Sequence, residues 1–289
     1  MKTPFPSYLQ RFQRVLRHID EHLGEGLGLD VLAGVAAFSP HHFHRQFTAL
    51  LGVPPGRYVQ LVRLKRATWR LAFRDAPVLE VALDSGYQGP EAFTRAFRQQ
   101  TGQSPSAFRR QPDWAAWQAG YRPVSDIRRN FMTDAFAPVR VIDAPDIPVA
   151  VLEHRGDPAT LGDSVRSFIQ WRRAAGLAPR LSATYNIFHD DPDQTDPADF
   201  RLDICAAAAR VPANDLGVRA GIIPGGRCAV LRHVGTDEGF GAAIRHLYAD
   251  WLPSSGQDLR DFPLYCQRVA FFPDVPEHEA ITDIFLPLK

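Results

Sequence analysis

The chain of 289 residues is long enough for two domains of ordinary size, and its 22% charged and 45% hydrophobic residues are the balance of a soluble globular protein. No run of about 18 apolar residues occurs, and the first residues lack the apolar core of a signal peptide. We therefore expect a cytoplasmic protein with no membrane partner.

The net charge of +1 hides an asymmetry along the chain. Residues 1–112 carry 15 Lys and Arg against 8 Asp and Glu, a balance of +7. Residues 113–289 carry the remaining 18 against 24, a balance of −6. This distribution indicates a polyanion-binding domain followed by a domain with another task.

A motif near the N-terminus occurs twice. Phe-x-Arg-x-Phe at 43–47 recurs at 93–97, and the glycine, proline and aromatic residues that follow each copy are also 50 residues apart: Gly52, Pro55 and Tyr58, then Gly102, Pro105 and Phe108. Two copies are too few for a solenoid, which needs at least three stacked units. We therefore expect two copies of one small helical module.

Each copy has the pattern of a short helix, a tight turn and a second helix with a polar outer face. Ser39 is a natural N-cap and Pro40 stands at the first position of the second helix. The second copy has one additional residue at its turn. In chain order, apolar spacing predicts helices over residues 8–23, 29–36, 41–51, 54 or 55 to 71 (a strongly basic connecting helix), 79–85 and 90–100.

Histidines invite a metal-binding interpretation at two places. His18 and His22 lie four residues apart on the first helix, but no third ligand is evident in the sequence, which favours a surface or capping role. His41, His42 and His44 are split around their helix, which argues against a metal cluster there. We expect no metal site.

The doubled module resembles the DNA-binding domain of AraC/XylS-type transcription regulators over residues 8–111. The second copy carries the resemblance most closely, through Gly86-Tyr87, Phe93-x-Arg95-x-Phe97-Arg98, Gly102, Pro105 and Phe108. Ala37 stands where the family usually has glycine. The resemblance implies an all-α, tandem helix-turn-helix domain that places two helices in successive major grooves of double-stranded DNA.

Matched positions suggest which side chains face each groove. Arg45 or Arg95 would pair with guanine and Glu91 with cytosine, whereas Arg98 and the basic residues of the connecting helix would contact phosphates. The alternative is that Arg45 and Arg95 are salt-bridged structural residues in a protein-interaction bundle. The full set expected to bind DNA is His41, His44, Arg45 and Thr48 in the first copy and Glu91, Thr94, Arg95 and Arg98 in the second.

The second half has a different periodicity. Residues 112–137 read as the end of a helix followed by a linker or packing segment, and β-branched strands begin beyond residue 138. Val-Leu-x-His-x-Gly at 151–156 recurs at 230–235, and each copy precedes a helical segment. We therefore expect residues 138–289 to form an α+β domain of two pseudo-symmetric strand–helix–strand–strand units.

This half resembles the GyrI-like effector-binding domain, through the paired Val-Leu-x-His-x-Gly segments, Tyr185 before an acidic, Pro-rich loop and the segment 282–287. The resemblance implies an aromatic-lined pocket for a small molecule, for which a cationic or amphipathic compound is a candidate. Many members carry a glutamate two residues before the tyrosine that matches Tyr265, and this chain has Pro263 there, which leaves the charge of the effector open. The residues expected to bind the effector are Trp171, Tyr185, Asp203 and Tyr265.

Together these patterns predict a sequence-specific, DNA-binding transcription regulator whose second domain senses a small-molecule effector. RNA polymerase is a candidate further partner. The alternatives are a hydrolase-like enzyme or a ligand-sequestering protein. No catalytic spacing or cofactor motif supports the enzyme, so we expect neither catalytic residues nor a cofactor. The three cysteines form no C-x-x-C pair and are expected to be reduced and buried.

Overall fold

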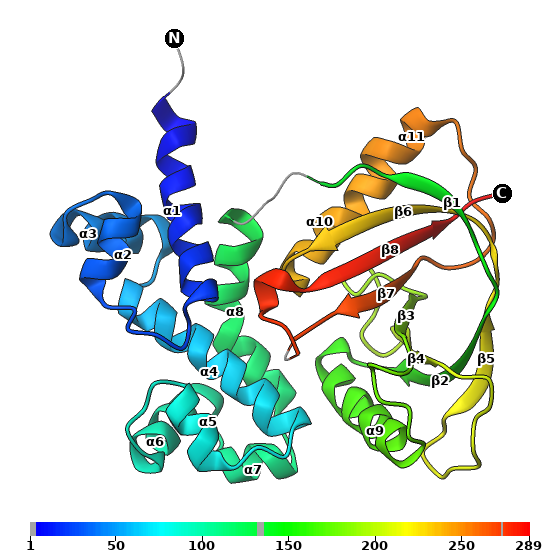
Figure 1. Cartoon of the computed structure of the whole chain (residues 1–289), viewed down its shortest axis with the longest axis horizontal. Helices are drawn as coiled ribbons and strands as arrows, with labels where there is room; N and C mark the ends of the chain where they lie inside the picture. Colours follow the sequence, from blue (N-terminus) through cyan, green and yellow to red (C-terminus); the bar gives the residue numbers. More distant parts are fainter. Residues whose placement is uncertain (1–3, 132–135, 273) are drawn as a thin grey trace. The chain divides into compact units, whose positions relative to one another are not determined.

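The computed structural model describes residues 4–131, 136–272 and 274–289 (Figure 1). By their contacts they form two units, residues 1–134 with 276–278 and residues 135–275 with 279–289. In the described parts of the chain, no helix has both the length and the apolar character needed to cross a bilayer.

The first unit is helical, and its helices begin where the sequence places caps and prolines. Ser39 accepts a hydrogen bond from the backbone N–H of His42, and Gly52 ends the same helix in the left-handed conformation. The described helices are α1 (Pro4–Glu21), α2 (Leu29–Ala36), α3 (Pro40–Leu51), α4 (Pro55–Phe73), α5 (Val78–Asp84), α6 (Pro90–Thr101), α7 (Pro105–Arg110) and α8 (Trp114–Phe131).

The two helix-turn-helix units, α2–α3 and α5–α6, use a left-handed residue at the same point of the turn. Ala37 has φ 54° and the equivalent Gly86 has φ 80°. Two residues separate Ala37 from α3, and three separate Gly86 from α6. The additional residue therefore lies in the second turn, as predicted, and Ala37 adopts a conformation that favours glycine.

The repeated aromatic residues form the interior of this unit. Phe47 packs edge-on against Tyr58 with ring centroids 5.9 Å apart, and Phe97 packs in the same way against Phe108 at 5.5 Å. All four side chains are fully buried. Because the phenylalanines of each motif point inward, the polar positions between them are turned to the surface of α3 and α6.

Helix α8 corrects the expectation for residues 112–137, since most of the expected linker is an 18-residue helix. Pro123 is accommodated inside the helix. Tyr121, Val124 and Ile127 bury one side of α8 within the unit. Packing of this stripe stabilises the helix despite the missing proline N–H. Residues 132–135 lie outside the described part.

The second unit is built on one eight-stranded sheet in which every pairing is antiparallel, with the order β1-β6-β8-β7-β3-β4-β2-β5. Its strands are β1 (Arg140–Ala144), β2 (Ile147–Arg155), β3 (Thr184–Phe188), β4 (Arg201–Ala207), β5 (Arg219–Ile223), β6 (Gly226–Val234), β7 (Tyr265–Ala270) and β8 (Ile281–Pro287). Its main helices are α9 (Leu161–Ala174) and α10 (Phe240–Arg245), the latter continued by a π-helical turn, His246–Trp251, and by α11 (Leu252–Ser255).

The predicted pseudo-symmetry is visible in the strand order. The sequence β2-α9-β3-β4 is repeated by β6-α10-β7-β8, and the two copies meet where β3 pairs with β7 (Figure 1). The edge strands are exchanged, because β1 pairs with β6 of the second copy and β5 pairs with β2 of the first. Helices α9 and α10 pack against one face of the sheet, each in its own apolar cluster.

The other face carries a buried cluster contributed by all eight strands and by no helix; we call it the helix-free face. Since the sheet itself buries these side chains, it must curl around them. The buried members of the cluster are Ala144, Val149, Val151, Tyr185, Ile187, Cys205, Ile223, Cys228, Val230, Tyr265 and Phe285.

Candidate nucleic-acid interface and effector site

Helix α3 exposes the residues predicted to face the first groove. His41, His44 and Arg45 are exposed, whereas Phe43 and Phe47 between them are buried. Thr48 is half-buried, and its hydroxyl donates a 2.8 Å hydrogen bond to the carbonyl of His44. This hydroxyl can still accept a hydrogen bond from DNA, but its proton is already donated to the carbonyl of His44.

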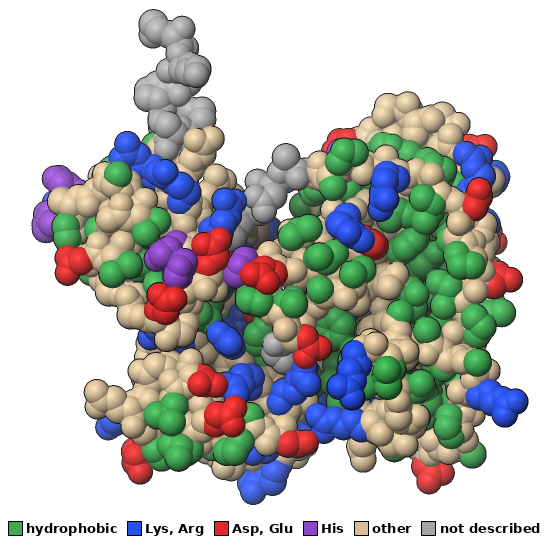
Figure 2. All heavy atoms as spheres, in the orientation of Figure 1, with side chains coloured by type: hydrophobic (Ala, Val, Ile, Leu, Met, Phe, Trp, Pro, Cys, Tyr) green, Lys and Arg blue, Asp and Glu red, His purple; other side chains and the backbone are tan. Residues whose placement is uncertain are grey.

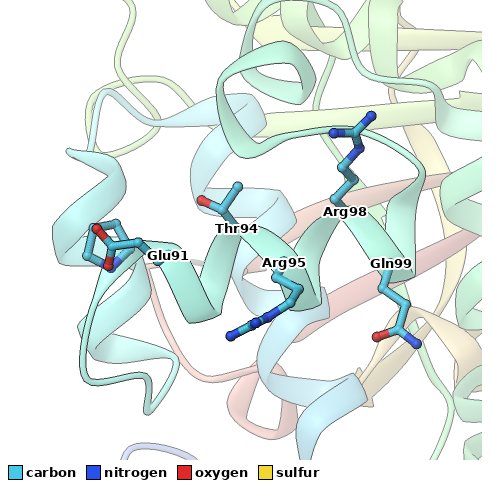
Figure 3. A pocket seen from close by; sticks show the side chains of 6 residues that line it. Glu91, Thr94, Arg95, Arg98 and Gln99 are labelled. Carbon is cyan, nitrogen blue, oxygen red and sulfur yellow. The ribbon is translucent and has the colours of Figure 1, made fainter.

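Helix α6 presents a shallow hollow lined by Pro90, Glu91, Thr94, Arg95, Arg98 and Gln99 (Figure 3). All four residues predicted for the second groove are among them. Gln99 was not predicted, although its place four residues after Arg95 puts it on the same side of the helix. Its amide can donate and accept hydrogen bonds at a base edge.

The arginines of the two motifs are available for a ligand. Arg45, Arg95 and Arg98 are exposed, and no hydrogen bond or ion pair joins any of them to another described residue. The alternative in which Arg45 and Arg95 are salt-bridged structural residues therefore has no support within the described part of the chain. Arginine side chains on two helix surfaces can contact phosphates and donate hydrogen bonds to the edge of guanine.

The connecting helix α4 differs from its prediction, because several of its basic side chains are engaged within the protein. Arg63 donates from Nε to the carbonyl of Leu23 at 3.0 Å and also contacts Glu25. Arg70 is paired with Glu80 and Asp84. These two arginines hold the surrounding loops and helices, which corrects the expectation that they contact phosphates. Arg66 of the same helix is exposed.

On the helix-free face of the second unit the structure brings together Tyr185, Asp203 and Tyr265 from three adjacent strands. Tyr185 pairs with Cys205 and Tyr265 with Ile187 in the strand register, so the two tyrosines lie across the β3–β7 seam from one another. Tyr265 stacks on Phe285 with centroids 4.7 Å apart and an interplanar angle of 5°. Phe285 was not predicted, although strand alternation places it on the face of Asp283.

Burial alters the acidity of both tyrosines. The apolar surroundings raise the pKa of Tyr265 above its ordinary value, and the pKa of Tyr185 is raised for the same reason. Both phenols are therefore neutral at physiological pH. Neutral aromatic faces can cover an apolar or cationic group, and each hydroxyl can still form hydrogen bonds.

Trp171 is not brought to this face. It lies on α9, is 3% exposed, and packs against Phe168 in the cluster between α9 and the sheet. Trp171 was expected to bind the effector, but the sequence could not tell which face of the sheet α9 covers. Trp171 is thus placed in the helix-to-sheet core, away from Tyr185 and Tyr265.

Asp203 is a buried polar residue of the helix-free face. It is 6% exposed, and its Oδ2 is 3.0 Å from Nε2 of His189. The other carboxylate oxygen, Oδ1, is buried and has no hydrogen-bond partner in the structure. A buried carboxylate oxygen without a donor is energetically unfavourable, so Oδ1 is a candidate acceptor for an N–H or O–H group of a ligand.

The pseudo-symmetric copy shows what such a position can hold. Asp283 of β8 corresponds to Asp203 of β4, and its two oxygens receive Nε and Nη2 of Arg232, both at 2.7 Å. In the register of the first copy, the residue beside Asp203 is Glu153 instead of arginine. Glu153 is itself paired with the exposed Arg219 at 3.2 Å. One copy is thus closed by its own arginine, and the other is acidic and incomplete.

Comparison with known proteins places both units. Residues 137–289 match the family model described as GyrI-like small molecule binding domain. The chain belongs to the GyrI-like family. Residues 32–111 match a helix-turn-helix domain. The GyrI-like protein therefore combines an AraC-type DNA-binding domain with a small-molecule-binding domain, which is the composition of a transcription regulator.

Two curated relatives from Escherichia coli K12 each match part of this chain. The probable transcriptional regulator YgiV is 40% identical over 159 residues, which are 54% of this chain and 99% of the relative. The right origin-binding protein is 35% identical over 105 residues, which are 36% of each chain. The two family models and these two relatives indicate no enzyme family.

Among solved structures, the DNA-binding domain of AdpA in complex with a target DNA is 34% identical, with a TM-score of 0.33. The match covers 39% of the GyrI-like protein and 94% of that domain.

Proposed function

We propose that α3 and α6 read two successive major grooves of a promoter and that the effector binds on the helix-free face at Asp203, Tyr185 and Tyr265. The single observation that supports the DNA-reading role is the pair of exposed arginines at matched positions, Arg45 and Arg95, neither of which bonds to another described residue. The two helices differ in chemistry, since α3 offers His41 and His44 where α6 offers Glu91 and Thr94. Unequal reading surfaces favour an asymmetric DNA site.

The proposed effector carries an N–H or O–H donor next to an apolar or aromatic body. Asp203 Oδ1 supplies the acceptor, and the neutral tyrosines supply apolar cover. The arginine that fills the equivalent position beside Asp283 supports a guanidinium or ammonium group as the best fit. Pro263 removes the charge that many relatives place near this tyrosine, and Asp203 replaces it from another strand.

A regulator is favoured over an enzyme by the state of the nucleophiles. Burial raises the pKa of the Cys205, Cys228 and Cys266 thiols, so all three are protonated at neutral pH and unreactive. A regulator of transcription acts in the cytoplasm, beside the chromosome, and RNA polymerase is its proposed further partner at the promoter.

Selection of bound DNA from a random pool tests the reading helices, with Arg95→Ala and Arg98→Ala as a matched pair. Arg95→Ala should weaken binding by about 1–3 kcal/mol and relax the preference at one base pair. Arg98→Ala should weaken binding to all sequences alike and reduce the salt dependence. No enrichment of any sequence by the unaltered protein, or an affinity insensitive to salt, would contradict the proposed function.

A further inference from the structure

The last turn of α1 brings together three side chains that the DNA-reading and effector-binding roles do not use. His18, Glu21 and His22 follow one another at i, i+3 and i+4, which places them on one side of a helix. The backbone N–H of His22 still bonds to the carbonyl of His18 at 3.1 Å, so the helical geometry continues through His22. The sequence suggested only two ligands here, and the structure supplies the third.

The three side chains offer donor atoms at nearly the spacing that a metal ion requires. One nitrogen from each imidazole and one carboxylate oxygen of Glu21 all lie within 4.8 Å of one another. The imidazole centroids are 4.0 Å apart, with an interplanar angle of 31°. Ligands of a tetrahedral zinc ion lie about 3.3 Å apart, given bond lengths of about 2.0 Å. Small side-chain rotations would close the difference.

One of the imidazoles is already oriented for metal binding. Nδ1 of His22 is 3.0 Å from the carbonyl oxygen of His18, and a nitrogen bonded to a carbonyl must carry the proton. Nε2 of His22 therefore has its lone pair directed away from that bond. Metal-binding histidines typically donate their second ring N–H to such an acceptor, which fixes the tautomer and the ring orientation.

The backbone beneath the three ligands is held on its other side. Ile19 is fully buried, and Asp20 forms a buried ion pair with Arg128 of α8. Arg63 binds the carbonyl of Leu23 immediately after the cluster. The ligands themselves are reachable, since both histidines are half-buried and Glu21 is exposed. Histidine side chains, purple in Figure 2, reach the surface over this helical unit.

We propose that His18, Glu21 and His22 form a binding site for a divalent transition metal of the zinc type. Two imidazoles and one carboxylate are a ligand set that suits zinc, nickel or copper rather than magnesium or calcium. Three protein ligands leave a fourth position for water. A metal bound across i and i+4 would lock the end of α1 and stabilise the folded first unit.

Calorimetric titration of the tag-free, metal-stripped full chain with zinc chloride tests the site. One zinc ion should bind per chain. His18→Ala should weaken this binding by at least about tenfold, the lower end of what removing even an outer-sphere partner does. Glu21→Gln should weaken it less than His18→Ala does, because the amide oxygen can still bind the metal, although it is a poorer ligand than a carboxylate. His42→Ala is the matched control, since His42 is exposed on α3 and should leave the affinity unchanged.

Two further measurements separate this site from other causes. Zinc should raise the unfolding temperature of the unaltered protein and of His42→Ala but not that of His18→Ala, whose unfolding temperature without zinc should be normal. Cobalt should give the visible bands of a tetrahedral site without a thiolate charge-transfer band. Equal zinc affinity in His18→Ala and the unaltered protein, a thiolate band, or no binding at all would overturn the proposal.

Discussion

Two aspartates at equivalent positions of the GyrI-like domain, Asp203 and Asp283, have different partners. This difference distinguishes a candidate ligand-binding residue from a residue that stabilises the fold. Asp283 accepts two hydrogen bonds from Arg232, whereas Asp203 has one oxygen without a donor. Removing the carboxylate that two arginine nitrogens share should destabilise the fold more than altering Asp203, which only His189 contacts, at one of its two oxygens. Asp203, which has one oxygen without a donor, is therefore the better candidate for contact with a ligand.

We expect Asp283→Asn to lower the free energy of unfolding by about 1.5 kcal/mol or more, because Arg232 loses a charged acceptor. Asp203→Asn should lower it by less, because only the partly exposed His189 loses a charged acceptor. Urea denaturation measures both.

Heat-stability screening with benzamidine and its neutral analogue benzamide tests ligand binding at Asp203. The cation should raise the unfolding temperature of the unaltered protein. This shift should be lost in Asp203→Asn and retained in Asp283→Asn, measured from the unfolding temperature of that variant without the compound. A shift that survives Asp203→Asn would remove Asp203 from the site.

The turn of the first helix-turn-helix unit carries local strain at Ala37. A non-glycine residue in the left-handed region is disfavoured by about 1–2 kcal/mol. Replacing it with glycine removes this strain, but glycine also loses more conformational freedom on folding, which cancels part of the gain in stability. Ala37→Gly should therefore raise the free energy of unfolding of the helical unit by about 0.5–1 kcal/mol. Denaturation followed by far-ultraviolet circular dichroism measures the change.

Gly52→Ala is the matched control for this turn. Gly52 has φ 74°, and a Cβ added there would meet no atom within 4 Å, so only the backbone conformation is altered. It should destabilise the same unit by about 1 kcal/mol. If both substitutions change stability in the same direction, left-handed strain at Ala37 is not the controlling effect.

At the scale of elements, the sequence predicted the helix boundaries that are determined by nearby residues. The helix of the first reading surface begins at Pro40 because Ser39 caps it, and it ends at Gly52 because glycine accepts the left-handed conformation. The offset between the two copies predicted the inward aromatics and the exposed arginines together.

Elements whose position depends on distant partners were not predicted. The apolar stripe of α8 was hidden by Pro123, since tertiary packing decides whether a proline is tolerated. The face of the sheet on which Trp171 packs depends on which face α9 covers, and the spacing of apolar residues along α9 does not specify that face. The exchange of β1 and β5 between the two halves, and the pairing of Asp203 with His189, are likewise contacts between distant strands and loops.

Helix α8 is joined to α1 by a buried ion pair, Arg128 with Asp20, whose side chains are 0% and 3% exposed. Removing Asp20 leaves the buried Arg128 with only Glu277, whose Oε2 is 3.8 Å from Nη1, so Asp20→Ala should destabilise the helical unit by up to about 3–5 kcal/mol. Glu80→Gln breaks a pair with Arg70 in which Glu80 is 53% exposed, and it should change stability by at most about 1 kcal/mol. Urea denaturation compares the two. Similar values would show that α8 contributes little to this unit.

At the scale of the whole molecule, the chain joins a basic first part to an acidic second part, and its regulatory role requires that one influence the other. A ligand can shift DNA binding only if it has different affinities for two states of the protein. Linkage makes the effect reciprocal, so a compound that changes DNA affinity by a given factor must have its own affinity changed by DNA by the same factor.

We expect this factor to lie between about 5 and 150, the range found for coupled sites. Fluorescence titration can measure the affinity for a selected DNA site with and without the stabilising compound, and the affinity for the compound with and without that DNA. Arg95→Ala should weaken DNA binding and leave compound binding to the free protein intact, whereas Asp203→Asn should do the reverse. A compound that binds at Asp203 with identical affinity in the presence and absence of DNA would contradict effector sensing while leaving the DNA-reading role of α3 and α6 in place, because the two helices bind DNA through Arg45 and Arg95 whether or not the second unit is occupied.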